Sequence, residues 1–362
     1  MRCTVDRDHL FNAVQFASQF SPAKSHKDVL TYTKLAVISD TRMVISTFDG
    51  EAQAEVDVDC NSTDLFQVLV NTQMLLKLLK NCDDEYLELD VDNLVDPSCL
   101  GIGNHDDRYE LVVLNGDLPP LPSAQQRHLT LPNGLLTRAN CLSVATDIES
   151  SRYALGGVLF HINSDGMHLC GTDGRRLMYY HTPVNAGAEW QCIVPTAVVK
   201  RIADLDGADV ELYVNENFVI FTTPKYRVAS RLVDGRFPNY MKVMEESEPA
   251  SARRTIDREL LLASLRRAML VSDEQNRGAE WVGDGNTLTL KASTAGIGKS
   301  KVSLQCEGEN TDEFKVTLDS RLIVQMIERL KSNTVDVKFH GEQGSVHVIC
   351  DGVTCVVMPM SR

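Results

Sequence analysis

An eight-residue segment in the last third of the chain ends like a phosphate-binding loop. Residues 293–300 read Ser-Thr-Ala-Gly-Ile-Gly-Lys-Ser, and a lysine followed by a hydroxyl could hold nucleotide phosphates and a magnesium ion. That motif requires a glycine where Ser293 stands and a helix directly after Lys299. The following residues, KVSLQCEG, are typical of a strand instead. We therefore predict a hairpin turn, with a nucleotide-dependent enzyme that uses Lys299 as the alternative.

Residues 171–177, Gly-Thr-Asp-Gly-Arg-Arg-Leu, place an aspartate and two arginines among glycines, which could also suggest phosphoryl chemistry. No general base or pair of metal-binding carboxylates accompanies them. The sequence also contains no nucleophile elbow, zinc-protease helix or dinucleotide fingerprint. We predict a tight turn that presents Thr172 and Arg176 on a binding surface, and a protein that is not an enzyme and needs no cofactor.

The ten cysteines and nine histidines could in principle form disulfides or a metal site. The cysteines are scattered without a C-x-x-C pair, and the histidines lack ligand spacing. We interpret the cysteines as reduced residues, most of them in the core, and expect no metal. No stretch approaches the roughly 18 apolar residues of a membrane helix, and the N-terminus lacks a signal peptide's apolar core. These features predict a soluble cytoplasmic protein.

The elements that carry these residues repeat along the chain. A short strand followed by a helix begins near Thr4 and recurs near Thr130 and Thr255, at spacings of 126 and 125 residues. A second strand and helix, beginning at Val70, recurs twice at a spacing of 124 residues. Each third of the chain therefore reads as two copies of one strand-helix-strand unit. We predict three homologous α+β domains, at 1–125, 126–250 and 251–362.

The six predicted helices differ in charge from the rest of the chain. They contain 12 basic and 4 acidic residues, whereas the remainder contains 24 basic and 46 acidic residues, within a net charge of −14. A basic helix face can contact DNA phosphates without reading sequence, and repeated units can close into a ring. One alternative is that these are ordinary solvated helix faces. A second is a scaffold that does not thread DNA and only gathers peptide partners. The predicted helices are 7–18, 72–81, 132–146, 196–203, 257–270 and 320–332, and the predicted DNA-facing residues on them include Lys77, Lys80, Arg138, Lys200 and Arg201.

Four strings carry a resemblance to a known family over nearly the whole chain. They are residues 171–177, residues 231–240 (RLVDGRFPNY), residues 356–360 (VVMPM), and an N-terminal pattern of Thr4-Val5, Arg7 and His9-Leu10. In this order they resemble the bacterial DNA polymerase III β subunit, the sliding clamp. The resemblance implies a DNA-clamp fold of three homologous domains, each with two helices packed on antiparallel sheets, in a head-to-tail homodimeric ring. It also implies a nucleoid-associated bacterial processivity factor that tethers the replicative polymerase to double-stranded DNA.

The family's partner-binding groove can be carried over residue by residue. In the family it receives a largely apolar peptide from polymerases, the clamp loader and other proteins. Two methionines that flank a proline would form an adaptable apolar surface for such peptides. The alternative is that residues 356–360 are only a last edge strand in the core. The implied groove residues are Leu155, Thr172, Gly174, Arg176, Leu177, Pro238, Val243, Ser345, Val356, Met358, Pro359 and Met360.

The resemblance also implies DNA contacts at Lys24 and within residues 149–153, where Arg152 and Tyr153 match the family. It implies a protomer interface that joins the surface around Tyr109 to Leu270 and Val271 of the partner protomer. The C-terminal Ser361-Arg362 departs from the usual ending, which could adjust the affinity for peptides. Three further positions depart from the family's DNA-contacting pattern: Gln73, Glu149 and Ala154.

Overall fold

The computed structural model describes residues 2–91, 98–104, 107–123, 127–149, 154–184, 189–245, 250–273, 277–310 and 313–360. The chain divides into two compact units. The first unit contains residues 1–133 and 204–232, and the second contains residues 134–203 and 233–362. In the described ranges, no helix is both long and apolar enough to cross a membrane. All ten cysteines are free thiols, as predicted.

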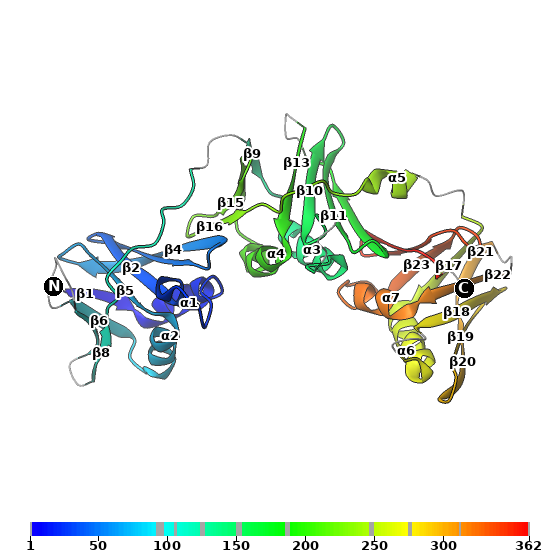
Figure 1. Ribbon diagram of the computed structural model, residues 1–362, viewed down its shortest axis with the longest axis horizontal. Coiled ribbons are helices and arrows are strands. Elements are labelled where there is room, and N and C mark those ends of the chain that lie inside the picture. Colours follow the sequence, from blue (N-terminus) through cyan, green and yellow to red (C-terminus); the bar gives the residue numbers. More distant parts are fainter. Residues whose placement is uncertain are drawn as a thin grey trace. The chain divides into compact units, whose positions relative to one another are not determined.

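The first unit is built on one antiparallel sheet that carries two helices (Figure 1). Its main path runs β8-β7-β6-β1-β4-β16-β15-β14-β9, and β2, β3 and β5 attach beside β4. Helices α1 (Arg7–Ser18) and α2 (Thr72–Asn81) pack side by side, and α1 also packs against β3 and β4. A 3₁₀ turn, η1, covers Asp28–Thr31. The strands are β1 (Arg2–Asp6), β2 (Tyr32–Ser39), β3 (Arg42–Phe48), β4 (Ala52–Ser62), β5 (Phe66–Asn71), β6 (Tyr86–Val91), β7 (Cys99–Gly103), β8 (Arg108–Val112), β9 (Arg127–Thr130), β14 (Glu211–Val214), β15 (Phe218–Thr222) and β16 (Tyr226–Arg231).

The second unit contains two antiparallel sheets. The larger runs β13-β10-β11-β12-β25-β24-β23-β17-β21, and the smaller runs β20-β19-β18-β22. The strands are β10 (Gly157–Asn163), β11 (Gly166–Thr172), β12 (Arg176–Thr182), β13 (Trp190–Pro195), β17 (Ala252–Asp257), β18 (Gly278–Asp284), β19 (Thr287–Thr294), β20 (Gly298–Gln305), β21 (Glu307–Asn310), β22 (Phe314–Asp319), β23 (Thr334–Phe339), β24 (Val346–Cys350) and β25 (Val353–Val357).

Four helices of the second unit pack on these sheets. Helices α3 and α4 lie side by side against β11 and β10, α7 contacts β25, and α6 covers β19 and β20. A fifth, short helix, α5, follows β16 in the chain and precedes β17 of the larger sheet. The helical segments are α3 (Leu135–Leu142), η2 (Ser143–Ala145), α4 (Thr196–Ile202), η3 (Ala203–Leu205, at the boundary of the units), α5 (Tyr240–Glu245), α6 (Arg258–Ala268), η4 (Met269–Val271) and α7 (Ser320–Ile327).

A buried hydroxyl explains the constant spacing of the second repeated motif. Helices α2, α4 and α7 begin at Thr72, Thr196 and Ser320, and each of these side chains is buried. Thr72 Oγ1 accepts a hydrogen bond from a neighbouring threonine at 2.9 Å, Thr196 Oγ1 lies 2.7 Å from Thr146 Oγ1, and Ser320 Oγ accepts from Trp281 Nε1 at 3.0 Å. Buried polar groups need such partners. In each repeat, the hydrogen bond of this hydroxyl therefore fixes the position of the first residue of the second helix.

The helix predictions are confirmed, with differences at the ends. The predicted helix at 132–146 is shorter, because Gly134 has φ +83 and the α-helix begins at Leu135 and passes into a 3₁₀ turn after Leu142. The hairpin prediction for residues 293–300 is also confirmed. Lys299 lies in β20, paired with β19, so the helix that a phosphate-binding loop requires is missing here.

Candidate functional site

Strand β25 forms the floor of an apolar surface on the second unit. It lies between β12 and β24, so it is an interior strand and not the edge strand of the alternative prediction. Val356 of β25 is the register partner of Leu177 of β12, and both side chains belong to one buried cluster. Leu155 is also buried. The fold thus brings together two of the predicted groove residues, Leu177 and Val356, that are far apart in sequence.

Helix α5 packs against this cluster and forms its wall. Pro238 leads into the helix, and Val243 is partly buried against the cluster, together with Met241 and Met244. Tyr240 anchors the helix to the sheet, because its Oη lies 2.6 Å from His161 Nδ1. The sequence prediction missed both of these methionines. Met241 and Met244 are three residues apart beside Val243, a spacing that places side chains on one face of a helix. This spacing could have identified them from the sequence.

The β11–β12 turn brings Met358 next to the cluster. Thr172 Oγ1 donates to the carbonyl of Arg176, which closes the turn, and Gly174 adopts φ +83, a conformation that favours glycine. The backbone N–H of Met358 donates to the carbonyl oxygen of Arg175 at 3.3 Å. The Met358 side chain is 50% exposed, whereas Val356 is buried. The exposed apolar side chain of Met358 therefore lies two residues beyond the buried Val356.

Thr172 and Arg176 differ from their prediction, because the turn presents neither side chain. Only 5% of Thr172 is exposed, and only 9% of Arg176. The Arg176 Nε donates to Asp173 Oδ2 at 3.0 Å, its Nη1 to Gln325 Oε1 at 2.7 Å, and its Nη2 to the carbonyl of Val144 at 2.6 Å. Every donating nitrogen of the guanidinium is engaged within the protein. Arg176 joins the turn to η2 and α7 and shapes the surface from below.

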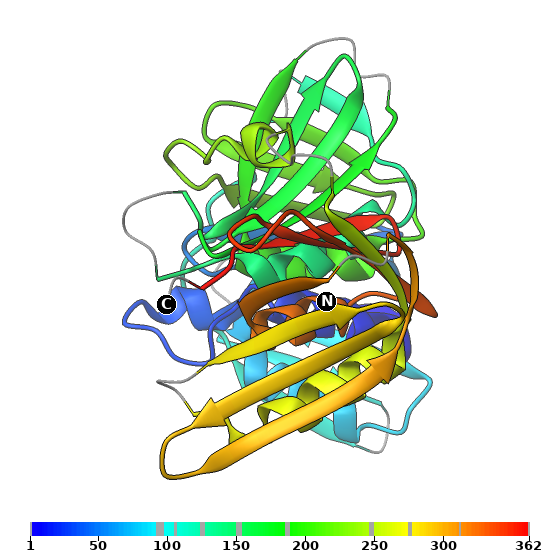
Figure 2. The ribbon, with the colours of Figure 1, turned by 90° about the vertical axis from the view of Figure 1, so that its right-hand side faces the viewer.

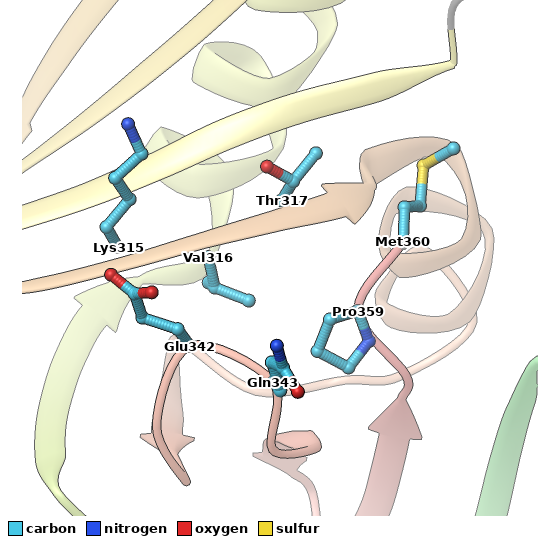
Figure 3. Close-up of a pocket in the computed structure, with 7 residues that line it drawn as sticks. All are labelled: Lys315, Val316, Thr317, Glu342, Gln343, Pro359 and Met360. Atoms are coloured by element: carbon cyan, nitrogen blue, oxygen red, sulfur yellow. The ribbon is translucent and has the colours of Figure 1, made fainter. Parts of the chain in front are cut away.

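The C-terminal residues carry this surface to the edge of the smaller sheet. Pro359 and Met360 line a cleft of about 700 Å³ together with Thr317 and residues of the 340–345 turn (Figure 3). The N–H of Met360 donates to the carbonyl of Thr317 at 2.9 Å. In the same turn, Ser345 Oγ lies 3.0 Å from His347 Nε2. Burial lowers the pKa of His347 to about 4, so its ring is neutral at pH 7.

The predicted DNA-facing lysines are exposed on their helices. Lys77 and Lys80 project to solvent from α2, and Gln73 is exposed one turn earlier on the same helix. Lys200 is exposed on α4, and Lys24 is exposed in the segment after α1. These ammonium groups are available to a polyanion. Arg201 is only half-exposed and has further interactions within the protein.

Arg138 is held by a carboxylate instead. Its guanidinium makes two hydrogen bonds to Asp351, at 2.6 and 3.0 Å, and lies over the ring of Tyr180. The Arg138 guanidinium holds the pKa of the Asp351 carboxyl below its usual value. The Asp351 carboxylate therefore neutralises, within the protein, the positive charge that the sequence prediction offered to DNA. Glu149 is exposed and Ala154 buried, and the predicted contacts Arg152 and Tyr153 lie outside the described residues, as does Ser361-Arg362.

Each unit has an exposed sheet edge with apolar side chains nearby. In the first unit, β8 pairs along its length with β7, and its Tyr109 and Val112 are exposed. In the second unit, β20 pairs with β19, and Leu270 and Ile297 are exposed beside it. Among the described strands, neither β8 nor β20 has a second ladder partner. Val271, the other predicted interface residue, is half-buried.

Over the ranges that the structure describes, no three histidine, cysteine, aspartate or glutamate side chains converge as metal ligands would.

Two family models match the chain. Residues 1–122 match the N-terminal domain of the DNA polymerase III beta subunit, and residues 132–239 match its central domain.

Similar proteins are known from several bacteria. The beta sliding clamp of Caulobacter vibrioides is 25% identical over 384 residues, which cover 99% of this chain and 100% of that protein. The DNA polymerase III subunit beta from Pseudomonas aeruginosa has a similar fold, with a TM-score of 0.90, 20% identity and complete coverage of both chains. The Helicobacter pylori beta clamp bound to a DNA ligase peptide has a TM-score of 0.85 and 15% identity, covering 100% of each chain.

Proposed function

Because this chain belongs to the DNA polymerase III beta subunit family, it is a processivity clamp that tethers partner proteins to DNA, and we propose that two copies close head to tail around the duplex. The observation that carries the proposal is the match of both family models, which together cover residues 1–122 and 132–239. The clamp holds DNA by topology and catalyses no reaction. As a replication clamp it acts on the nucleoid in the cytoplasm.

The two exposed sheet edges support the head-to-tail arrangement. Strand β8 with Tyr109 and Val112 belongs to the first unit, and β20 with Leu270 nearby belongs to the second. An exposed edge readily pairs with a strand of another chain. Joining β8 of one protomer to β20 of its partner is a heterologous contact, and two such contacts close a dimeric ring.

The exposed lysines of the repeated helices support a sequence-independent hold on DNA. Lys77 and Lys80 on α2, Lys200 on α4, and Lys24 could each meet a phosphate without contacting a base. We include Arg201 on the charge pattern of the repeated helices, and Arg152 and Tyr153 on the resemblance alone.

Retention on circular DNA tests the ring. The protein is loaded onto nicked circular DNA and washed at a salt concentration that abolishes ordinary ionic binding. A threaded ring stays bound to the circle and is released when the DNA is cut to a linear form. A scaffold that does not thread would be lost from the circle in the wash, and retention after cutting would likewise exclude a sliding ring.

The apolar surface on the second unit is the proposed site for partner peptides from the replicative polymerase, the clamp loader and other proteins. The Helicobacter pylori clamp binds a DNA ligase peptide, and a Pseudomonas aeruginosa clamp binds griselimycin. In this chain, Leu177 and Val356 would receive the peptide's apolar side chains, and Met358 would cover them. Methionine suits this role because its flexible thioether adapts to different shapes.

A labelled copy of that ligase peptide, here called the probe peptide, tests the groove by fluorescence anisotropy. We expect Met358→Ala combined with truncation before Met360 to weaken binding about tenfold or more, because interface energy concentrates in a few apolar anchors. Leu65→Ala, at an exposed leucine of the first unit, is the matched control and should bind normally. Equal affinity for both variants would rule out this groove.

A further inference from the structure

The smaller sheet of the second unit has one face rich in lysine. Leu290 and Ala292 of β19 are buried on the face that α6 covers, and the alternate residues point the other way. Figure 2 shows the sheet face-on with α6 behind it. Four of the outward-facing residues are exposed lysines in a chain whose net charge is −14: Lys291, Lys299, Lys301 and Lys315.

Around Lys291, Lys299 and Lys301 the positive charge exceeds the negative charge. Glu280 is the carboxylate in the hollow that these three lysines line, and its Oε2 lies 2.6 Å from Lys315 Nζ and its Oε1 3.5 Å from Lys291 Nζ. Glu342 lines the neighbouring cleft with Lys315. Among the described residues, no carboxylate forms an ion pair with Lys299 or Lys301. Lys291 and Lys301 are direct cross-strand partners, and like charges in that position destabilise a sheet. The fold itself therefore does not account for this arrangement, which suits an anionic ligand.

The proposed groove opens onto the lysine face at Met360. A Cβ added to Gly278 would lie 3.3 Å from the Met360 Sδ, so the methionine lies directly over this glycine. Thr317 lines the cleft that contains Pro359 and Met360 (Figure 3), and it also lines a second hollow formed by Gly278, Glu280 and three of the lysines. The two hollows are therefore neighbours across β22, with Met360 at their boundary.

We propose that the lysine face extends the partner-peptide groove and binds acidic residues located beside the apolar segment of a partner peptide. This inference rests on the groove proposed above. The register Thr317–Glu280–Lys291–Lys301 crosses the four strands. With neighbouring strands about 4.8 Å apart, Lys291 lies about 10 Å and Lys301 about 14 Å from Thr317. An extended peptide advances about 3.3 Å per residue, which places the acidic residues about three to five positions from the last apolar one.

The test extends the probe peptide with Gly-Gly followed by three glutamates, at either the N-terminus or the C-terminus. Matched peptides carry three glutamines instead. We expect one of the two glutamate peptides to bind about fivefold tighter than its glutamine counterpart at low salt, a typical sum for a few exposed ion pairs. High salt should remove the difference, because exposed pairs are screened.

Two double variants connect this gain to the lysine face. In Lys291→Gln/Lys301→Gln the advantage of the glutamate peptide should disappear, while affinity for the original probe peptide stays the same. This variant removes a like-charge pair, so it should fold normally. Lys27→Gln/Lys225→Gln removes two exposed charges from the first unit and should keep the full advantage.

Several results would overturn the proposal. One is that the original probe peptide binds but its glutamate and glutamine extensions bind equally well. This result would contradict the role of the lysine face and leave the groove proposal intact. Another is an advantage that persists in Lys291→Gln/Lys301→Gln. A change confined to DNA retention or to the sedimentation of that variant would assign the lysines to DNA or to the partner protomer. Failure of the original probe peptide to bind would remove the groove and its extension together.

Discussion

Asp351 has two roles in the β24–β25 hairpin: it forms part of the turn, and it pairs with Arg138. The substitution Asp351→Asn tests the ion pair alone. Asp351 and Gly352 form the two-residue loop between Cys350 and Val353, with φ of +55 and +75. Two successive residues with positive φ are typical of a hairpin turn that favours Asn-Gly or Asp-Gly. Asparagine therefore preserves the turn and removes only the charge that faces Arg138.

The cost of Asp351→Asn can be estimated from the contacts. Asp351 accepts two hydrogen bonds from Arg138 and one from the backbone N–H of Lys331 at 3.1 Å. Hydrogen bonds to charged groups contribute about 1.5–3 kcal/mol when well buried. Both side chains are about one quarter exposed, so solvent screening reduces this value. We expect the free energy of unfolding to fall by about 1–2 kcal/mol at pH 7.

The pH dependence checks the origin of this cost. The hydrogen bond from Arg138 is the main cause that lowers the pKa of Asp351 in the folded protein. Its stabilisation is therefore present above the unfolded pKa of about 3.9 and is lost as pH falls through the lower folded value. In urea denaturation the gap between wild type and Asp351→Asn should be full at pH 7 and shrink below pH 4. A gap that is absent at pH 7, or unchanged at pH 3, would refute the reasoning.

The same substitution should strengthen DNA binding. Without the Asp351 carboxylate, the positive charge of the Arg138 guanidinium is no longer neutralised within the protein and can meet phosphate. The logarithm of the binding constant should then depend on the logarithm of salt concentration with a slope steeper by about 0.9 for each protomer. Arg138→Gln/Asp351→Asn is the control and should lose the effect. A DNA affinity that falls in Asp351→Asn would show that Arg138 has no access to phosphate.

Three further predictions concern assembly, pH and packing. Leu270→Glu should shift the protein from dimer to monomer in sedimentation velocity. The control Leu65→Glu, at another exposed leucine, should remain dimeric. If Leu270→Glu is still a dimer, this interface is excluded. Burial lowers the pKa of His168 to about 4, so the free energy of unfolding should fall as pH drops from about 6.5 towards 4. In His168→Gln this decline should be smaller by about 1 kcal/mol or more. A decline identical to that of the wild type would contradict the assignment to His168. Trp281→Phe should cost about 2–3 kcal/mol in denaturant unfolding, because it leaves the buried Ser320 hydroxyl without its donor and opens a cavity, and a loss under 0.5 kcal/mol would contradict this account.

The sequence was most informative where one local rule repeats. Thr72, Thr196 and Ser320 recur at a fixed interval because each begins a helix and buries its hydroxyl, so the positions of these helices could be predicted. The end of the third predicted helix was less predictable, because Gly134 adopts a positive φ that the apolar periodicity does not reveal. Element positions follow from periodicity, and their boundaries follow from single residues.

Contacts between distant residues could not be predicted in the same way. Arg138 and Asp351 are 213 positions apart, and nothing local to either residue indicates their ion pair. Arg176 lies in a turn whose sequence suggests exposure, yet its guanidinium is engaged by η2 and α7. The lysine face was hidden because a charge count over all non-helical residues averages over both faces of every sheet. Side-chain direction becomes visible only once the strand register is known.

The division of the chain into units affects how the protein can be made. The first unit's sheet is completed only when Tyr226 of β16 pairs with Val56 of β4, although residues 134–203 of the intervening sequence belong to the second unit. During synthesis the ribosome must therefore extend the nascent chain beyond residue 232 before the first unit can close. Strand β12 gains β25 as its second neighbour only when the C-terminal strands have emerged. Co-translational folding would thus complete the two large sheets in two delayed steps.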